Sequence, residues 1–369
     1  MKIKTIICTD ARELNKMKND LDPFLSGHSK NPFILYPFIE TYMQSNCQDS
    51  IPIILVAIVN EKIVGLAPLQ LRKNRIFQTI NFLFPYFVSP DFVVADEYRE
   101  QVLRIFLQTI VKKIKCETIV LDLPGESQNL PILEKVSKDF KLTFEKQLAD
   151  SMSQCKISLQ GSLIDFENAQ GGQFKRKFRR ISRNLDENGE WKIIVKENVQ
   201  NEQNIQETFD KIMAIEKNSW KGNWRIENGC TIDKDLLWIW NASLLETKSN
   251  PDFKCKIWFL ELNNQTIAYH LVIEYLGTTF ITKTSFAEKY RNFSPGIFVH
   301  QAIITEQIRS KETNTIDFLT NLPFMKTWKV KCYPRVTFTL KRSLISDLFV
   351  RKTIDLAYKL SHTTKVVKI

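Results

Sequence analysis

One order of predicted elements occurs twice along this chain, and this repeat constrains the fold more than any other feature of the sequence. Each copy begins with two apolar strands around a two-residue turn, Asn60–Glu61 in the first copy and Asn263–Asn264 in the second. A third strand, a helix and a short fourth strand then follow at similar spacing. The predicted elements are 52–59, 62–71, 76–84, 96–115 and 118–123 in the first copy, and 256–262, 265–276, 278–286, 295–311 and 315–319 in the second.

The repeat predicts an α/β (α+β) protein made of two tandem halves, residues 1–150 and 151–369. We expect each half to be a mixed, mostly antiparallel sheet with helices on its flanks. The length of 369 residues also favours two domains over one. Further predicted elements are a strand at 2–8 and helices at 10–20, 32–45, 203–219, 233–248 and 343–362.

Apolar runs and cysteines limit the class of protein. The longest apolar run, 51–59, has the size of a strand and falls short of the ~20 residues that a membrane span needs. The N-terminus lacks a small-residue cleavage site, so it predicts a strand and not a signal peptide. Seven cysteines without a CxxC pair and four histidines without HExxH argue against a zinc site or a disulfide framework. We therefore expect a cytoplasmic protein with free thiols and no metal.

The excess positive charge lies in the second half. Residues 1–150 carry 19 basic and 18 acidic side chains, whereas residues 151–369 carry 33 and 23. Two clusters account for most of this difference: 174–183 has six basic residues and no acidic one, and 326–352 has eight basic residues against Asp347. An anionic ligand is therefore expected to bind the second half.

The junction between the predicted strand 278–286 and the following helix is the most informative local stretch. Ser294, Pro295 and Gly296 stand where the helix begins, and proline is well suited to a first helical turn. The free N–H groups of a helix start attract anions, phosphate above all, and Gly296 lacks the Cβ that would obstruct a pyrophosphate. The same residues are also ordinary capping chemistry, so this feature alone leaves both interpretations open.

This stretch resembles motif A of the GNAT acyltransferases, whose signature Arg/Gln-x-x-Gly-x-Gly/Ala binds the pyrophosphate of coenzyme A. Arg291 and Gly296 match the signature, and Ser294 stands in place of its first glycine. The resemblance implies a cofactor site for acetyl-CoA or another acyl-CoA in the second half only. Its residues would be Arg291, Asn292, Phe293, Ser294, Gly296 and Ile297.

A wider resemblance extends over most of the chain and points to the CelD/BcsL-like group of GNAT proteins, which is similar to FemA/FemB-type transferases with two GNAT-like halves. Its landmarks here are 32–38, 65–69, 89–93, the arginine-rich stretch, Glu216 and Trp220, and 317–328. After Asp317 the sequence departs from the usual acidic and glycine-bearing pattern of that group. The resemblance implies tandem GNAT-like halves and a substrate-binding role for Glu216 and Trp220.

The function that the resemblance implies is acyl-CoA-dependent N-acyl transfer, with acetyl as the expected acyl group. The acceptor would be an amine on a sugar, polysaccharide or cell-envelope precursor. Two alternatives stay open: FemA/FemB-like aminoacyl transfer from charged tRNA, and a non-catalytic GNAT-like binding protein. No helix-turn-helix, zinc-finger or RRM signature accompanies the basic residues, so DNA is not an expected partner.

Four residues are candidates for catalysis. His270 and Glu274 lie at alternate positions of one predicted strand and therefore project the same way, and both are candidate general bases. A buried, hydrogen-bonded His270 and a solvated Glu274 are the alternatives. Asp317 is our first choice for contacting the acceptor or positioning Lys326, with a structural ion pair as its alternative. His300, one turn into a helix among apolar residues, is expected to pack in the core.

The arginine-rich stretch predicts an anionic partner, because six cations without an acid repel one another. Phe174 and Phe178 are four residues apart, so one face of this helix should pack against the protein. Arg176, Arg179 and Arg180 are the candidates for binding an acceptor that is anionic or carries an anionic group. An ordinary solvated helix is the alternative.

Overall fold

The computed structural model describes residues 3–47, 50–73, 78–140, 142–222 and 234–341. The chain separates into two compact units. Unit 1 consists of residues 1–28, 47–150 and 334–369, and unit 2 consists of residues 29–46 and 151–333. The helix predicted at 343–362 lies outside the described residues. Within the described part of the chain, no helix combines the length and the apolar character that crossing a membrane requires.

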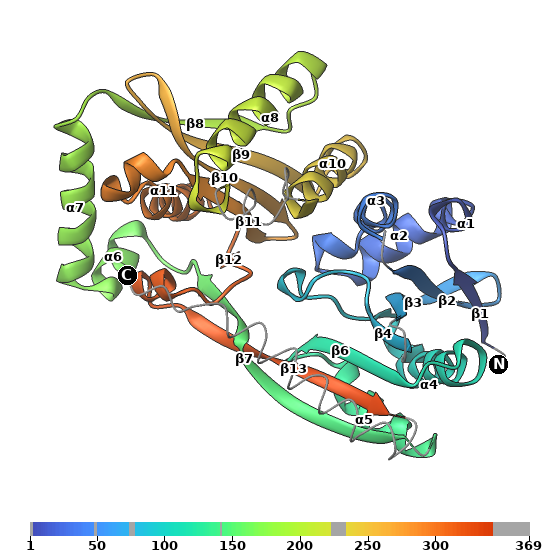
Figure 1. Cartoon of the computed structure of the whole chain (residues 1–369). Helices are drawn as coiled ribbons and strands as arrows, with labels where there is room; N and C mark the ends of the chain where they lie inside the picture. The colour runs from blue at the N-terminus through green and yellow to red at the C-terminus, as the bar shows by residue number, and fades with distance from the viewer. Residues whose placement is uncertain (1–2, 48–49, 74–77, 141, 223–233, 342–369) are drawn as a thin grey trace. The chain divides into compact units, whose positions relative to one another are not determined.

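Unit 1 contains a sheet with strand order β1-β2-β3-β4-β6-β13, in which β4 and β6 are parallel and the other neighbours are antiparallel (Figure 1). A two-stranded pairing of β3 with β5 lies off this path. The strands are β1 (Lys4–Cys8), β2 (Ile51–Val59), β3 (Lys62–Lys73), β4 (Gln78–Phe82), β5 (Val93–Val94), β6 (Thr118–Pro124) and β13 (Lys331–Lys341, in this unit from residue 334). The helical elements are α1 (Ala11–Asn15), α2 (Lys18–His28), η2 (Tyr86–Val88), η3 (Asp96–Tyr98), α4 (Arg99–Thr109), the π-helical turn η4 (Ile110–Ile114) and α5 (Asn129–Asp139).

Unit 2 contains a sheet with strand order β7-β12-β11-β10-β9-β8, in which β11 and β12 are parallel (Figure 1). The strands are β7 (Thr143–Ser158, in this unit from residue 151), β8 (Trp191–Glu197), β9 (Phe253–Leu262), β10 (Gln265–Tyr275), β11 (Thr278–Phe286) and β12 (Thr315–Asp317). The helical elements are η1 (Pro32–Ile34), α3 (Tyr36–Asn46), α6 (Leu163–Gln170), α7 (Gly172–Asp186), α8 (Glu202–Lys217), α10 (Lys234–Ser249), η5 (Glu288–Phe293), α11 (Pro295–Ser310) and η6 (Pro323–Thr327).

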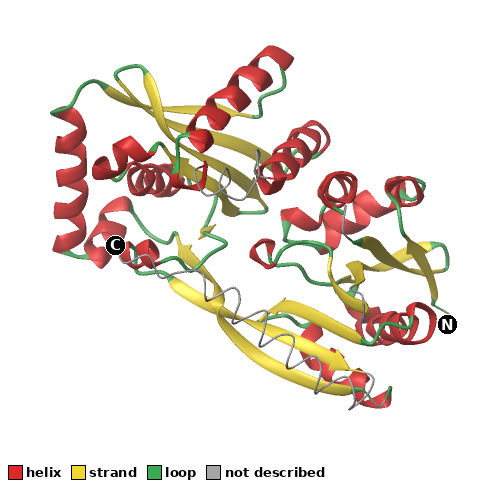
Figure 2. Ribbon diagram, in the orientation of Figure 1, coloured by secondary structure: helices red, strands yellow, loops and turns green. Residues whose placement is uncertain are grey.

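The predicted fold class, a mixed sheet flanked by helices with one order used twice, is confirmed (Figure 2). Both hairpin turns place two residues in the left-handed region, with φ of 46° and 64° at Asn60 and Glu61 and of 49° and 60° at Asn263 and Asn264. Asparagine tolerates this conformation, and such turns match the twist of the flanking strands. In both copies the strand after the long helix lies parallel to the third strand.

The strand that follows each copy pairs with a strand of the other copy. Lys156–Ser158 of β7, which follows the first copy, pairs with β12 in unit 2. Arg335–Lys341 of β13, which follows the second copy, pairs with β6 in unit 1. The sequence pattern predicts neither β7 nor β13. Helix α3, which precedes the first copy, also belongs to unit 2, where Phe38 and Tyr42 pack edge-on against Trp238 with ring centroids 6.0 and 5.2 Å apart.

Helices cover both faces of the sheet in unit 2. Successive residues of β10 point to opposite faces, so Tyr269 contacts α8 while His270 contacts α11. The core is formed by near-continuous apolar strands, and Leu260, Ile267, Val272 and Ile304 are fully buried within it. The strands therefore hold polar side chains of β10 at fixed positions on two different faces.

Candidate active site

The loop between β11 and α11 forms an open helix start. The 3-10 turn η5 ends at Ser294, which takes the left-handed conformation (φ 50°, ψ 46°), and Pro295 is the first helical residue. The Ser294 hydroxyl makes no capping hydrogen bond, and the Ser294 carbonyl accepts from the N–H of Phe298 at 3.1 Å. The N–H groups of Gly296 and Ile297 precede the first intrahelical donors and so face outward from the helix end. This geometry suits a phosphate.

The other residues predicted for the cofactor contribute in different ways. Arg291 is exposed, and its Nε lies 2.7 Å from Oε1 of Glu288. The side chains of Phe293 and Ile297 are partly buried against the core of unit 2. A Cβ at Gly296 would lie 3.6 Å from Cδ1 of Phe286, an ordinary contact. Packing within the protein therefore does not require glycine at 296. Asn292 is exposed.

The parallel strands β11 and β12 part beside this loop. Their pairing ends at Phe280 and Asp317, after which β11 continues to Phe286 while the other chain segment turns through Leu319, whose φ is 56°. A bulge in β11 inserts Thr282, whose hydroxyl donates to the carbonyl of Leu271 at 2.7 Å. The backbone edges of the two strands no longer pair with each other beyond this point.

Asp317 lies at the point of divergence and is 4 % exposed. Its Oδ1 accepts from the N–H of Leu319 at 2.8 Å, and its Oδ2 lies 3.6 Å from Nζ of Lys156. Lys156 comes from β7 and also lies over the ring of Tyr333, 5.2 Å from its centroid. Sequence reasoning missed Lys156 because β7 was not predicted. The side chain of Lys326 lies outside what the structure describes.

His270 forms a buried pair with His300. Nε2 of His270 lies 2.7 Å from Nδ1 of His300, and Nδ1 of each ring lies 2.7 Å from a backbone carbonyl, that of Tyr269 and that of Gly296. Because a carbonyl only accepts, each Nδ1 carries the proton, and His270 Nε2 accepts from His300. Burial lowers the pKa of both rings, to about 4 for His300 and well below 6.5 for His270, where the proximity of His300 adds to the effect. Both rings are therefore neutral at pH 7.

This pair connects the sheet to the predicted phosphate loop. The Gly296 carbonyl that accepts from His300 belongs to the first turn of α11. The other side of the His300 ring packs against Phe318, Phe324 and Trp328, with centroids 5.4 to 5.6 Å away. His300 packs in the core, as the sequence indicates, but it also fixes the helix start.

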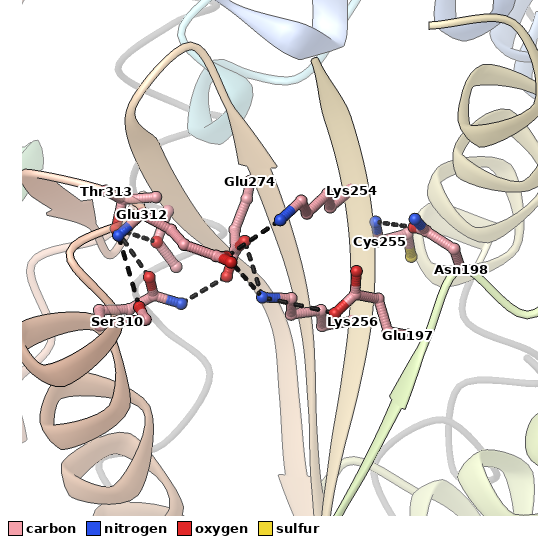
Figure 3. A network of polar contacts seen from close by, with 11 residues as sticks. Glu197, Asn198, Lys254, Cys255, Lys256, Glu274, Ser310, Glu312 and Thr313 are labelled. Carbon is pink, nitrogen blue, oxygen red and sulfur yellow. Dashed lines mark hydrogen bonds and ion pairs between the residues drawn. The ribbon is translucent and has the colours of Figure 1, made fainter. Parts of the chain in front are cut away.

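Glu274 belongs to a separate buried network at the other end of β10, shown in Figure 3. It shares the α11-facing side of the strand with His270, and Gln307 of α11 donates to its carboxylate. Lys256 contacts Glu274 at 2.9 Å, Glu312 at 3.3 Å and Glu197 at 3.6 Å. Burial alone would lower the pKa of Lys256, but the hydrogen bond to Glu274 and the surrounding carboxylates raise it. The arrangement is that of a structural ion-pair cluster.

The residues predicted for the acceptor occupy two places. Glu216 of α8 is 1 % exposed and accepts from the Tyr269 hydroxyl at 2.7 Å, whereas Trp220 is 53 % exposed. Arg176 and Arg180 line a pocket on α7, and Arg179 is exposed on the same helix but is not among the residues that line this pocket. The three catalytic candidates whose side chains are described are likewise dispersed, since Asp317, His270 and Glu274 each have their own partners.

Two cysteines differ from the expectation of free thiols. Cys155 of β7 and Cys332 of β13 form a disulfide bond, and Oδ1 of Asn321 lies 3.4 Å from the sulfur of Cys155. The expectation is therefore wrong for this pair, because the unpredicted strands bring two distant cysteines together. Among the residues that the structure describes, no group of three or more His, Cys, Asp or Glu side chains is placed to hold a metal ion.

Part of the chain matches a known family model, and the whole fold is similar to solved structures. Residues 172–329 match the family model described as an acetyltransferase (GNAT) domain, a segment that covers less than half of the chain. No curated protein matches the chain.

Several solved structures have a similar fold at low sequence identity. FemX has 12% identity and a TM-score of 0.56, with 91% of this chain and 96% of that chain covered. The L-PGS of Bacillus licheniformis has 11% identity and a TM-score of 0.55, with 94% and 97% covered. A conserved protein of unknown function from Bacteroides thetaiotaomicron has 10% identity and a TM-score of 0.53, with 89% and 97% covered. These likenesses show the fold, and the match of residues 172–329 to the GNAT acetyltransferase domain supports an acyltransferase.

Proposed function

We propose that this protein is an acyl-CoA-dependent N-acyltransferase that transfers an acyl group, acetyl in the simplest case, to an amine. The observation that carries the proposal is the outward-facing start of α11 beside strands that part at Phe280 and Asp317. The first feature offers N–H groups for a pyrophosphate, and the second offers unpaired strand edges for an extended arm. Both lie within the segment that matches the GNAT domain.

In this proposal the protein mainly binds the acyl donor and the acceptor amine and orients them toward each other. The N–H groups of Gly296 and Ile297 hold the pyrophosphate, and the neutral His300 keeps the first turn of α11 in position through the Gly296 carbonyl. An acyl-CoA supplies an acyl group activated as a thioester. Positioning the acceptor amine next to it accounts for much of the rate, and a backbone N–H of β11 near the bulge at Thr282 stabilises the developing oxyanion.

Asp317 is the carboxylate that we propose for contact with the acceptor amine. It stands where β11 and β12 part, and Lys156 compensates its charge from one side. A carboxylate held in this way can accept a hydrogen bond from an ammonium group and orient it. The neutral His270 and the ion-paired Glu274 stay predictions for the general base, and Lys326 stays a prediction for a catalytic residue that Asp317 positions.

The finer assignments are also part of the proposal. We place the acyl-CoA site in the half at 151–369 and expect none in the half at 1–150. The acceptor would be a sugar, polysaccharide or cell-envelope precursor, as the resemblance to the CelD/BcsL-like group implies. An acyl-CoA donor is a cytoplasmic metabolite, so we expect the protein to act in the cytoplasm.

Aminoacyl transfer from charged tRNA is the second candidate. The fold is similar to FemX and to an L-PGS, and the excess positive charge of the second half suits a polynucleotide. A non-catalytic GNAT-like binding protein is the third candidate, which the departures at Ser294 and after Asp317 favour.

Ligand-dependent stability separates these candidates. A ligand that binds only the native state raises the unfolding temperature. At a ligand concentration of a hundred times its Kd, the unfolding free energy rises by about 2.7 kcal/mol. We expect acetyl-CoA and free CoA to stabilise the protein and deacylated or charged tRNA to leave it unchanged. Stabilisation by tRNA alone would favour the second candidate. Stabilisation by CoA without any acyl transfer to amines would favour the third.

A further inference from the structure

A basic pocket lies on α7, away from the residues proposed for the acyl donor. Its volume is about 630 Å³, and it is lined by one stripe of α7, by the last residues of α6 and η6, and by Lys329. The stripe has the i, i+3, i+4, i+7 spacing of one helix face. The lining residues are Gln170, Gln173, Phe174, Arg176, Lys177, Arg180, Thr327 and Lys329. None of residues 291–297 is among them.

Four cations converge on this pocket without a described carboxylate to balance them. Arg176, Lys177, Arg180 and Lys329 make no ion pair with any acidic residue that the structure describes. Cations elsewhere on the same helix do have such partners, since Lys175 lies 3.8 Å from Glu167 and Arg183 lies 3.9 Å from Glu187. Burial and the charge of Arg180 lower the pKa of Lys177. An anion in the pocket would relieve this repulsion.

The core side of α7 holds the pocket in place. The rings of Phe174 and Phe178 lie 4.7 Å apart, and Phe178 packs on Trp328 at 6.3 Å. Nζ of Lys177 donates to the hydroxyl of Thr327 at 2.8 Å. The N–H of Lys329 donates to Oε1 of Gln170 at 2.9 Å. These two hydrogen bonds join the helical side of the pocket to the segment that contains Thr327 and Lys329.

We propose that this pocket binds a phosphate or diphosphate group carried by a small-molecule acceptor. A phosphate group has a charge near −2 at neutral pH and several strong acceptor oxygens, and arginine binds it through two parallel hydrogen bonds. Four cations exceed what one carboxylate needs, and they suit a phosphate ester or a diphosphate. The binding site stands on its own geometry, whereas its assignment to an acceptor rests on the proposed acyl transfer.

The test titrates inorganic pyrophosphate into the full chain by calorimetry at low salt, without any acyl donor. We expect Arg176→Gln/Arg180→Gln to weaken binding roughly tenfold or more, because both guanidinium groups line the pocket. The matched control is Lys175→Gln/Arg183→Gln, which removes the same charge from the same helix outside the lining residues. It should change the affinity by less than about threefold, as screened surface charges do.

Two results would overturn the site: no pyrophosphate binding by the wild-type protein, or equal losses in the two double variants. Because this titration needs no acyl-CoA, a protein that binds pyrophosphate but no CoA would retain the site and refute the proposed function. Competition then identifies the source of the phosphate. Displacement of pyrophosphate by CoA but not by dephospho-CoA would assign the pocket to the cofactor, and displacement by tRNA would exclude a small-molecule acceptor.

Discussion

The two units contain the same loop at the same place in the repeat. In unit 1, the chain after β4 forms the turn η2 and ends it at Ser89, whose φ is 55°. In unit 2, the chain after β11 forms η5 and ends it at Ser294, whose φ is 50°. A proline follows each of these left-handed serines.

The loops differ at the residue after the proline. In unit 2, Gly296 continues directly into α11. In unit 1 this residue is Asp91, which accepts from the N–H of Phe92 at 2.7 Å and from Nδ2 of Asn129 at 2.9 Å. Strand β5 and the turn η3 then intervene before α4 begins at Arg99. The repeated backbone thus serves two purposes, because in unit 1 the carboxyl group of Asp91 fills the position at which unit 2 leaves an open helix start.

Acid should affect these two loops in opposite directions, and this is the largest effect that we expect. Burial raises the pKa of Asp91, so its contribution to stability is present at low pH and is lost as pH rises through that pKa. The pKa of His300 is lowered to about 4, so its contribution is lost as pH falls from 6.5 towards 4. From His300 alone, unit 2 should lose about 3 kcal/mol of stability by pH 4.

Tryptophan fluorescence can follow this loss in unit 2. All seven tryptophans lie between residues 191 and 328, within unit 2. Denaturant unfolding monitored by fluorescence should therefore show a stability that falls below pH 6.5. The double variant His270→Gln/His300→Gln should flatten this dependence, and a pH slope that the variant retains would contradict the assignment to the pair.

Replacing Gly296 of unit 2 with the aspartate found at the same place in unit 1 should strongly weaken binding of the acyl donor. Gly296→Asp places a carboxylate at the helix start, as in unit 1, and we expect a loss of acyl-CoA affinity of about 100-fold, or ~2.7 kcal/mol, by calorimetry. An acidic residue in a first helical turn stabilises the helix, so this variant should remain folded. Gly296→Ala separates the added Cβ from the added charge: a Cβ fits against the protein there, so this variant should fold, and its acyl-CoA affinity should lie between those of the wild type and Gly296→Asp. Equal affinities of all three proteins would remove the proposed cofactor site.

Removing the Asp91 carboxyl group from the loop of unit 1 should not create a second acyl-CoA site. Its effect is the smallest of those that we expect. Asp91→Ala leaves the N–H of Phe92 and one contact of Asn129 unsatisfied, which should lower the unfolding free energy by about 2 kcal/mol, measured by circular dichroism. Acyl-CoA affinity should not change, because β5 and η3 still separate this loop from α4. An additional equivalent of bound CoA would show that Asp91 alone distinguishes the two loops.

Local sequence patterns predicted the fold and the start of the helix at residues 294–296. They did not predict the contacts between segments that are distant in sequence. The hairpins follow from apolar runs around Asn60 and Asn263, and the helix start follows from adjacent residues. Strand β7 carries charged residues along its length and β13 contains Pro334, so neither has a clear strand pattern. The same omission concealed the partners that these strands bring, Lys156 for Asp317 and Cys155 for Cys332.

The histidines show the same limit at a single site. The sequence indicates the side of the strand on which His270 lies and the buried position of His300, but not their contact across 30 residues. Periodicity assigns each residue to a face of its own element. It does not specify which residues of two packed elements meet.

The pairing of β6 with β13, which lies far along the chain, has a consequence for synthesis of the protein. Strand β6 ends at residue 124, yet its neighbour β13 ends at residue 341. A ribosome adds about 5–20 residues per second, so one edge of the first sheet waits on the order of 10–40 s for its partner. During that time the nascent chain exposes unpaired N–H and C=O groups, which other strands can bind. Chaperone capture of the growing chain would be most valuable during this interval, before the second copy has been translated.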